Sequence, residues 1–195
     1  MEKEFMSLQN KRKVWDVSKV RKKADVIREA RQDGRKVHFA RVFGMCSIKG
    51  SELPKGHKDR KHKGRFVYDG RDGAVRDEYN DYAIFENQGS SPATIESSKL
   101  VDYYSLLPGH VGEDNDADQA YVQAKIKSEC WVTLPQEYWP DHFWKIENPV
   151  VPLEQALYGH PDAGTLWAVK SHNHLEKQGF RKLESSSSLF WHEDL

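Results

Sequence analysis

Residues 113–126 read Glu113-Asp114-Asn115-Asp116-Ala117-Asp118-Gln119-Ala120-Tyr121-Val122-Gln123-Ala124-Lys125-Ile126. A run of carboxylates leads directly into an Ala-Tyr-Val segment that favours a buried, extended conformation. Acidic oxygens are therefore expected at the mouth of a strand. Such a junction can hold a metal ion.

Three interpretations of this junction compete. An EF-hand calcium loop would use Asp114, Asp116 and Asp118 as alternate ligands, but Gln119 stands where the turn glycine is needed and Lys125 where a bidentate glutamate is needed. The second interpretation is a solvated acidic turn, because charge runs usually face water. The third is a magnesium site for phosphoryl chemistry, in which substrate phosphates complete the ligand shell.

The segment Asp116-Ala117-Asp118-Gln119-Ala120-Tyr121-Val122 resembles the first catalytic motif of reverse transcriptases, and the flanking residues are similar to those of copia-type LTR retrotransposons. The resemblance implies that Asp116 ligates catalytic Mg²⁺ (or Mn²⁺) and that Ala117 offers its backbone carbonyl. It also implies that Ala120 and Tyr121 line the nucleotide site, with the Tyr121 ring under the incoming sugar. Asp114 and Asp118 have no counterpart and are expected to be solvated.

A second segment, Lys63-Gly64-Arg65-Phe66-Val67-Tyr68, resembles the family's Lys-Ala-Arg-Leu-Val-Ala. The resemblance implies that Arg65, with Lys63 nearby, reaches the triphosphate of the incoming nucleotide. A guanidinium can donate to two phosphate oxygens and offset the charge that develops during transfer. The alternative is an ordinary exposed cation on a strand.

A third segment, Ala156-Leu157-Tyr158-Gly159-His160-Pro161-Asp162-Ala163-Gly164-Thr165-Leu166-Trp167, is similar to the family's Ser-Leu-Tyr-Gly-Leu-Lys-Gln-Ala-Pro-Arg-x-Trp. The resemblance implies that Gly159 lets the backbone approach a template base pair. Pro161-Asp162 replaces the family's Lys-Gln, which helps to place template and nucleotide.

Composition limits the functional classes. The 195 residues suffice for one domain or part of a larger one, with 37% hydrophobic and 31% charged residues. No apolar run is long enough for a membrane span or a signal peptide. Cys46 and Cys130 lack metal-ligand spacing; a reducing compartment is the simpler interpretation, and one disulfide stays open.

The net charge of zero hides an asymmetry. Residues 1–76 contain 22 Lys and Arg against 10 Asp and Glu, and the remainder contains 8 against 20. A basic half suits a polyanion and an acidic half suits divalent metal. The alternative is that the two halves attract each other.

The expected class is α+β, with an antiparallel sheet covered by helices: part of the fingers and palm of a right-hand polymerase. A basic amphipathic helix, with Val17, Val20, Ala24 and Ile27 at helical spacing over 18–32 and a stop at Asp33-Gly34, is expected on an otherwise loose tail, 1–36. An incomplete reverse transcriptase domain, 37–195, follows. Its parts are fingers strands and loops (37–94), a palm helix covering the sheet and the first catalytic strand (95–126), a fingers or connecting hairpin (127–155), and a palm helix and strand (156–195).

The resemblance implies RNA-directed DNA polymerisation by two-metal transfer. Implied partners are an RNA template, a DNA primer, deoxynucleoside triphosphates and the remainder of the Pol polyprotein, without a membrane. The implied location is cytoplasmic, in a virus-like particle, with nuclear entry as an option. The chain stops before the expected Tyr-x-Asp-Asp hairpin, and one carboxylate cannot hold two magnesium ions, so we expect inactivity of the chain alone. The alternatives are a non-catalytic nucleic-acid-binding remnant and a product that does not fold stably.

Overall fold

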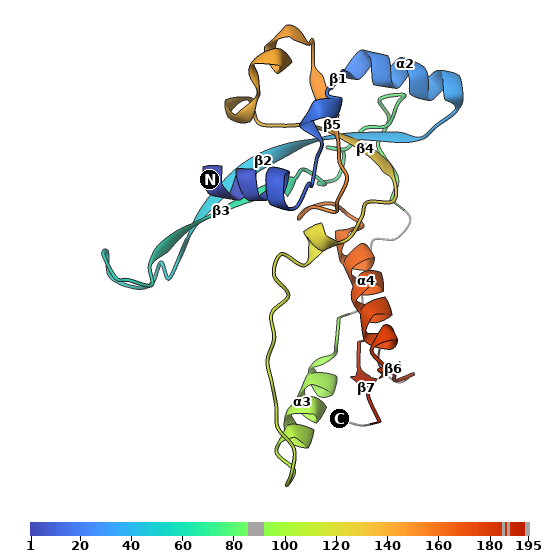
Figure 1. The fold of residues 1–195 in the computed structure, drawn as a ribbon. Coiled ribbons are helices and arrows are strands. Elements are labelled where there is room, and N and C mark those ends of the chain that lie inside the picture. The colour runs from blue at the N-terminus through green and yellow to red at the C-terminus, as the bar shows by residue number, and fades with distance from the viewer. Residues whose placement is uncertain (86–91, 185, 187, 194–195) are drawn as a thin grey trace.

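The computed structural model describes residues 1–85, 92–184, 186 and 188–193 and has a mixed five-stranded sheet in the order β1-β5-β4-β2-β3 (Figure 1). The strands are β1 (Arg21–Lys22), β2 (Val37–Lys49), β3 (Lys61–Tyr68), β4 (Glu129–Thr133) and β5 (Pro149–Pro152). The expected α+β class is confirmed. The expectation of an antiparallel sheet is wrong, because β2 and β4 pair in parallel across a long connection, as parallel strands require.

The hairpin of β2 and β3 follows the sequence closely. Apolar residues alternate along 36–48 and the following loop contains Gly and Pro, a pattern typical of a hairpin, and the strands pair antiparallel with Met45 opposite Arg65. Val37 and Phe39 are buried on one face of the sheet, and Val42 is buried in the core of the other face. β5 lies within 127–155, the range expected to form a fingers or connecting hairpin, and pairs antiparallel with β4.

One face of the sheet is covered by α2 (Lys23–Asp33), which packs Val26 and Ala30 against Val37, Phe39 and Val150. Gly34 ends this helix in the left-handed conformation, φ 66°, as the Asp33-Gly34 signal predicted, although the helix begins at Lys23 rather than Ser18.

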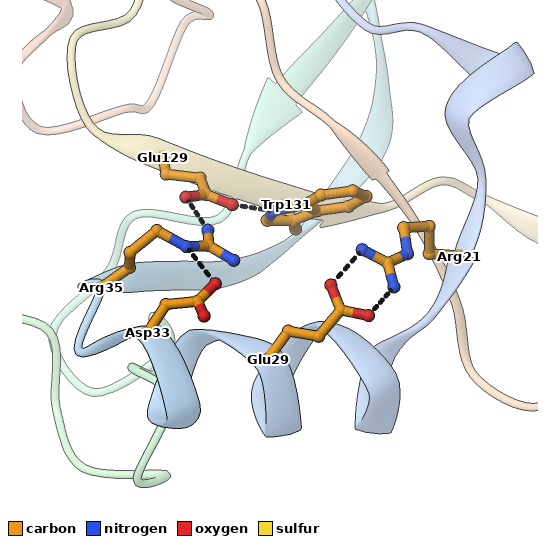
Figure 2. Close-up of polar contacts among 6 residues, drawn as sticks. All are labelled: Arg21, Glu29, Asp33, Arg35, Glu129 and Trp131. Atoms are coloured by element: carbon orange, nitrogen blue, oxygen red, sulfur yellow. Dashed lines mark hydrogen bonds and ion pairs between the residues drawn. The ribbon is translucent and has the colours of Figure 1, made fainter.

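Ion pairs tie α2 and its C-terminal end to the strands on either side (Figure 2). Arg21 on β1 makes a bidentate pair with Glu29. Arg35 bridges Asp33 and Glu129, and Glu129 also accepts a 3.1 Å hydrogen bond from the Trp131 indole. These bonds fix the helix above β1 and β4.

The N-terminal segment forms α1 (Glu2–Met6) and a π-helical turn η1 (Ser7–Lys11). The expectation of a loose tail is wrong here, because Phe5, Leu8, Val14 and Trp15 are at most 2% exposed in the larger core. The Phe5 ring contacts Trp15 and stacks on Tyr138 at 4.2 Å. The basic residues between these apolar ones concealed the pattern.

The helix expected within 95–126 is confirmed as α3 (Ile95–Ser105), with Thr94 as N-cap to the Ser97 amide. Its predicted packing on the sheet is wrong: it lies away from the sheet (Figure 1), and Ile95 and Tyr103 are 70% and 66% exposed. Helical periodicity predicts the helix but not its neighbours in space.

The remaining elements are short except for the predicted helix α4 (Ala163–Lys177). They are the 3-10 turns η2 (Val17–Lys19), η3 (Tyr121–Gln123), η4 (Gln136–Tyr138) and η5 (Asp141–Lys145), and the antiparallel pair β6 (Arg181–Lys182) and β7 (Phe190–Trp191). The range 156–195, expected to hold a palm helix and a strand, lies partly outside the described residues. Within the described ranges, no helix is long and apolar enough to cross a membrane.

Candidate functional site

The acidic stretch is not the predicted strand. Residues 110–117 have no regular secondary structure, and Asp114, Asp116 and Ala117 are exposed. Gln119 takes φ 52°, and the chain then turns into η3, because a left-handed residue interrupts an extended backbone. Asp116 therefore lies on a loop and not on a strand of the sheet.

Asp118 was expected to be only solvated, but it also makes an ion pair. Its carboxylate pairs with Arg12, and Arg12 Nε donates to the Gln119 side chain at 2.8 Å. This contact ties the acidic loop to the N-terminal segment. Among the residues that the structure describes, no group of three or more His, Cys, Asp or Glu side chains is arranged to hold a metal ion. Metal ligation by Asp116 and Ala117 stays a prediction.

Three of the predicted site residues, Arg65, Tyr121 and Gly159, lie beside Tyr158. The Tyr121 ring is 4.8 Å from the Tyr158 ring, and the Arg65 guanidinium carbon is 5.8 Å from that ring's centre. Burial raises the pKa of the Tyr158 phenol, Arg65 opposes this shift and the Asp116 carboxylate adds to it. Gly159 follows directly in the chain. Sequence reasoning left Tyr158 out of the site, although it precedes Gly159 in the quoted motif.

Tyr121 is only partly free to meet a ligand. Its half-buried ring also packs against the small core of Ala124, Ala156 and Leu166, and Ala120 beside it is half-buried. That Ala120 and Tyr121 line a nucleotide site, with the Tyr121 ring under the sugar, stays a prediction.

Position 159 requires glycine because the backbone there packs closely against β3. Its φ is 88°, and a Cβ would fall on the Tyr68 carbonyl oxygen and 2.7 Å from Val67 Cγ1. The Tyr68 amide donates to the Tyr158 carbonyl at 2.8 Å, which holds the two segments together. A template contact at Gly159 stays a prediction, but the close approach of backbone that motivated it is present, toward a strand.

One face of the β2–β3 hairpin is basic. Lys61, Lys63 and Arg65 alternate along β3 and so share a face, and Lys49 stands directly opposite Lys61 on β2. All four are exposed, and within the described part of the chain none has an ion-pair partner. We call these four residues the hairpin cations.

The other face of the hairpin is covered by the N-terminus. A Cβ at Gly44 or Gly64 would come within 2.6 Å of the Met1 side chain, so glycine at both positions lets α1 lie close to the strands. The contact leaves the hairpin cations on the open face.

A buried carboxylate holds two arginines at the base of the hairpin. Asp69, 3% exposed, accepts from Arg71 at 2.8 and 3.0 Å and from Arg41 at 2.8 Å. These two guanidinium groups, Arg71 foremost, hold the pKa of the Asp69 carboxyl well below its usual range, against the effect of burial. Sequence reasoning missed this cluster, because Arg41 and Asp69 meet only through strand pairing.

Comparison with protein-family models, curated proteins and solved structures finds no match, so the residues themselves carry the functional argument.

Proposed function

We propose that this chain binds nucleic acid through the hairpin cations, without catalysing phosphoryl transfer by itself. The observation that carries the proposal is the unpaired basic face of β2 and β3. Between Ser47 and Arg65 the chain has seven Lys and Arg against two Asp and Glu. A stripe of this kind suits a phosphate backbone.

The electrostatic repulsion among the hairpin cations supports a bound polyanion. Lys49 and Lys61 are directly opposed across the strands, an arrangement that destabilises a sheet. Along β3, side chains on one face repeat about every 6.6 Å, so the cations form a row that an extended single strand could follow. Phosphates laid along this row would remove the repulsion.

Binding of a labelled single-stranded RNA, followed by fluorescence anisotropy, tests the proposal. The variant Lys61→Ala/Lys63→Ala/Arg65→Ala should bind about 100-fold more weakly at 0.1 M salt. For a single strand, each phosphate contact contributes about 0.7 to the slope of log K against log salt, so three lost contacts lower log K by about 2 at this salt concentration. The control Lys145→Ala/Lys177→Ala/Lys182→Ala removes the same charge from exposed residues elsewhere and should bind within about threefold of the parent. Equal losses in the two variants would contradict a specific surface.

A second candidate is the nucleotide-binding region of a copia-type reverse transcriptase. It is favoured by the grouping of Arg65 and Tyr121 beside Tyr158. In this candidate Arg65 and Lys63 bind the triphosphate, and Asp116 with the Ala117 carbonyl offers ligands to Mg²⁺ or Mn²⁺. The partners would be an RNA template, a DNA primer and the rest of a Pol polyprotein.

The described residues do not fit a two-metal centre, because they include no group of three or more His, Cys, Asp or Glu side chains arranged to hold a metal ion. Primer extension on an RNA template should therefore give no product with this chain alone. The variant Asp116→Asn separates the two candidates: it leaves RNA binding unchanged under the first proposal and weakens metal-dependent binding of a deoxynucleoside triphosphate under the second.

A further inference from the structure

A basic pocket of about 430 Å³ is lined by α4 and by the segment 124–127, which connects η3 to β4. Lys125 and Lys127 line it from the segment, and Lys170 lines it from α4. We call these three residues the pocket lysines. All three are exposed, so a ligand in solution can reach them. Among the described residues, no Asp or Glu lines the pocket, and its lining is therefore positive.

The face of α4 that borders this pocket changes in character along the helix. Leu166 and Val169 are apolar, whereas Asn173 and His174, about one turn further on, carry polar groups. Lys170 lies between these two pairs. A helix face that packs on its own chain is normally apolar along its length. The polar end of this face is therefore better suited to a ligand than to packing.

Two carboxylates near the pocket lysines are already paired elsewhere. Glu129 makes an ion pair with Arg35. Glu154, which lines a separate pocket together with Lys125, makes an ion pair with Lys19. Each of these carboxylates is thus largely neutralised by another cation.

A third carboxylate, Asp162, lines an adjacent pocket together with Lys127. Burial raises the pKa of the Asp162 carboxyl, which disfavours the charged form that would neutralise a lysine. Within the described part of the chain, none of the pocket lysines makes an ion pair. Their positive charge therefore stays uncompensated.

One of the pocket lysines is held in place by the backbone. Lys170 Nζ donates to the Gln123 carbonyl at 2.5 Å, which joins α4 to the end of η3. The carbonyl is neutral, so this bond orients the ammonium group without cancelling its charge. An ammonium group has three donors, and two of them remain for a ligand.

We infer that this pocket binds a small molecule that carries two or more phosphate groups. Ammonium groups act as point-charge partners of phosphate, and a bound anion would remove the repulsion among the pocket lysines. Adjacent phosphates can contact all three lysines, whereas a single phosphate meets only some of them. The volume falls within the range of about 300–1,000 Å³ that is typical of small-molecule sites. The inference uses none of the hairpin cations, so it stands or falls apart from nucleic-acid binding.

Inorganic triphosphate is a suitable probe, because it is a compact polyanion without a base or a sugar. Titration into the isotope-labelled full chain at constant ionic strength, followed by amide NMR, should show saturable binding with shifts at Lys127, Lys170 and Asn173. Inorganic phosphate should bind about tenfold more weakly, since two lost charge contacts cost about threefold each at an exposed site. Equal binding of the two probes, or no saturable binding, would overturn the inference.

Charge-removing variants place the probe in the pocket. Lys125→Gln/Lys127→Gln/Lys170→Gln should weaken triphosphate binding about 30-fold, at about threefold for each lost contact. The matched control Lys36→Gln/Lys99→Gln/Lys145→Gln removes the same charge from exposed lysines that do not line this pocket, and it should bind within about threefold of the parent. Equal losses in the two variants would overturn the inference.

A second variant keeps all three pocket lysines. Val169 lines the pocket and is 44% exposed, so the chain can accept a polar side chain there. Val169→Glu should weaken triphosphate binding about tenfold relative to Val169→Gln, because a carboxylate repels the anion and competes for the lysines. Equal binding in these two variants would overturn the inference.

The RNA experiment distinguishes this pocket from a general polyanion surface. The variant that lacks the pocket lysines should bind the labelled RNA within about threefold of the parent. A loss of RNA binding as large as that of the hairpin variant would assign these lysines to the nucleic-acid surface and overturn the inference.

Adenosine triphosphate identifies the source of the phosphates. Its binding is compared with that of inorganic triphosphate at the Lys170 amide. Tighter binding of adenosine triphosphate would assign the pocket to a nucleotide whose base lies on the apolar walls, and weaker binding would assign it to a phosphorylated ligand without a base. Failure of both to shift this amide would contradict the chemistry proposed here.

Discussion

Replacing Gly159 by alanine should destabilise the whole chain. The left-handed φ of 88° costs an L-residue about 1–2 kcal/mol, and the new Cβ would meet the Tyr68 carbonyl and Val67 Cγ1. Crowding of this kind adds about 1–3 kcal/mol when a strand and a turn must move apart. The expected loss in unfolding free energy is therefore about 2–5 kcal/mol, or roughly 4–20 °C in melting temperature for a chain of this size.

Urea unfolding followed by far-ultraviolet circular dichroism measures this loss. Gly56→Ala is the matched control, because Gly56 has φ 91° but nothing within 4 Å of a Cβ, so only the backbone cost of about 1–2 kcal/mol applies. If Gly159→Ala costs no more than Gly56→Ala, the close approach to β3 does not explain this glycine.

Three further predictions concern buried titratable groups. Burial lowers the pKa of the His160 ring to about 4, so as the pH falls the unfolded chain binds a proton before the folded chain does. The free energy of unfolding should therefore fall by about 2 kcal/mol between about pH 7.5 and pH 5. Urea titrations at both pH values check this, and His160→Phe should reduce the fall. Asp69→Asn should lower the free energy of unfolding by about 1–3 kcal/mol at neutral pH, because Arg41 and Arg71 lose an ionised partner but stay hydrated. In the parent the pKa of Asp69 is depressed, so the same stabilisation is lost as the pH falls below about 4. Cys46 should react at once with Ellman's reagent, whereas Cys130, 2% exposed and with its pKa raised by burial to about 12, should react only after denaturation.

Contrary results are specific for each group. A pH dependence in His160→Phe equal to the parent's would assign the effect to other groups, His38 among them, whose pKa burial also lowers. An Asp69→Asn variant as stable as the parent at neutral pH would show that the two arginines need no carboxylate. Fast reaction of both thiols in the folded chain would mean that β4 opens readily.

The sequence anticipated features that depend on near neighbours. The hairpin of β2 and β3 follows from alternation and a turn-forming loop, and the end of α2 follows from Gly34. Thr94 likewise marks the start of α3. Each of these signals lies within a few residues of the feature that it marks.

Features that depend on distant partners were not anticipated. A strand at 116–126 needs a neighbour, but β4 takes the place beside β2, and Gln119 turns the acidic stretch into a loop. Tyr158 meets Tyr121 and Arg65 only because Gly159 crosses β3. Periodicity cannot supply such pairings, because it carries no information about which segments come together.

The strand order also governs how the chain emerges from the ribosome. β1 pairs with β5, Arg21 opposite Val150, so an edge strand made early has its neighbour only after most of the chain has been synthesised. At about 5–20 residues per second, this delay lasts roughly 6–26 s. Trp15, which forms a backbone bridge with Leu153, lacks that partner in the nascent chain for about the same time and is an apolar site that a chaperone can bind.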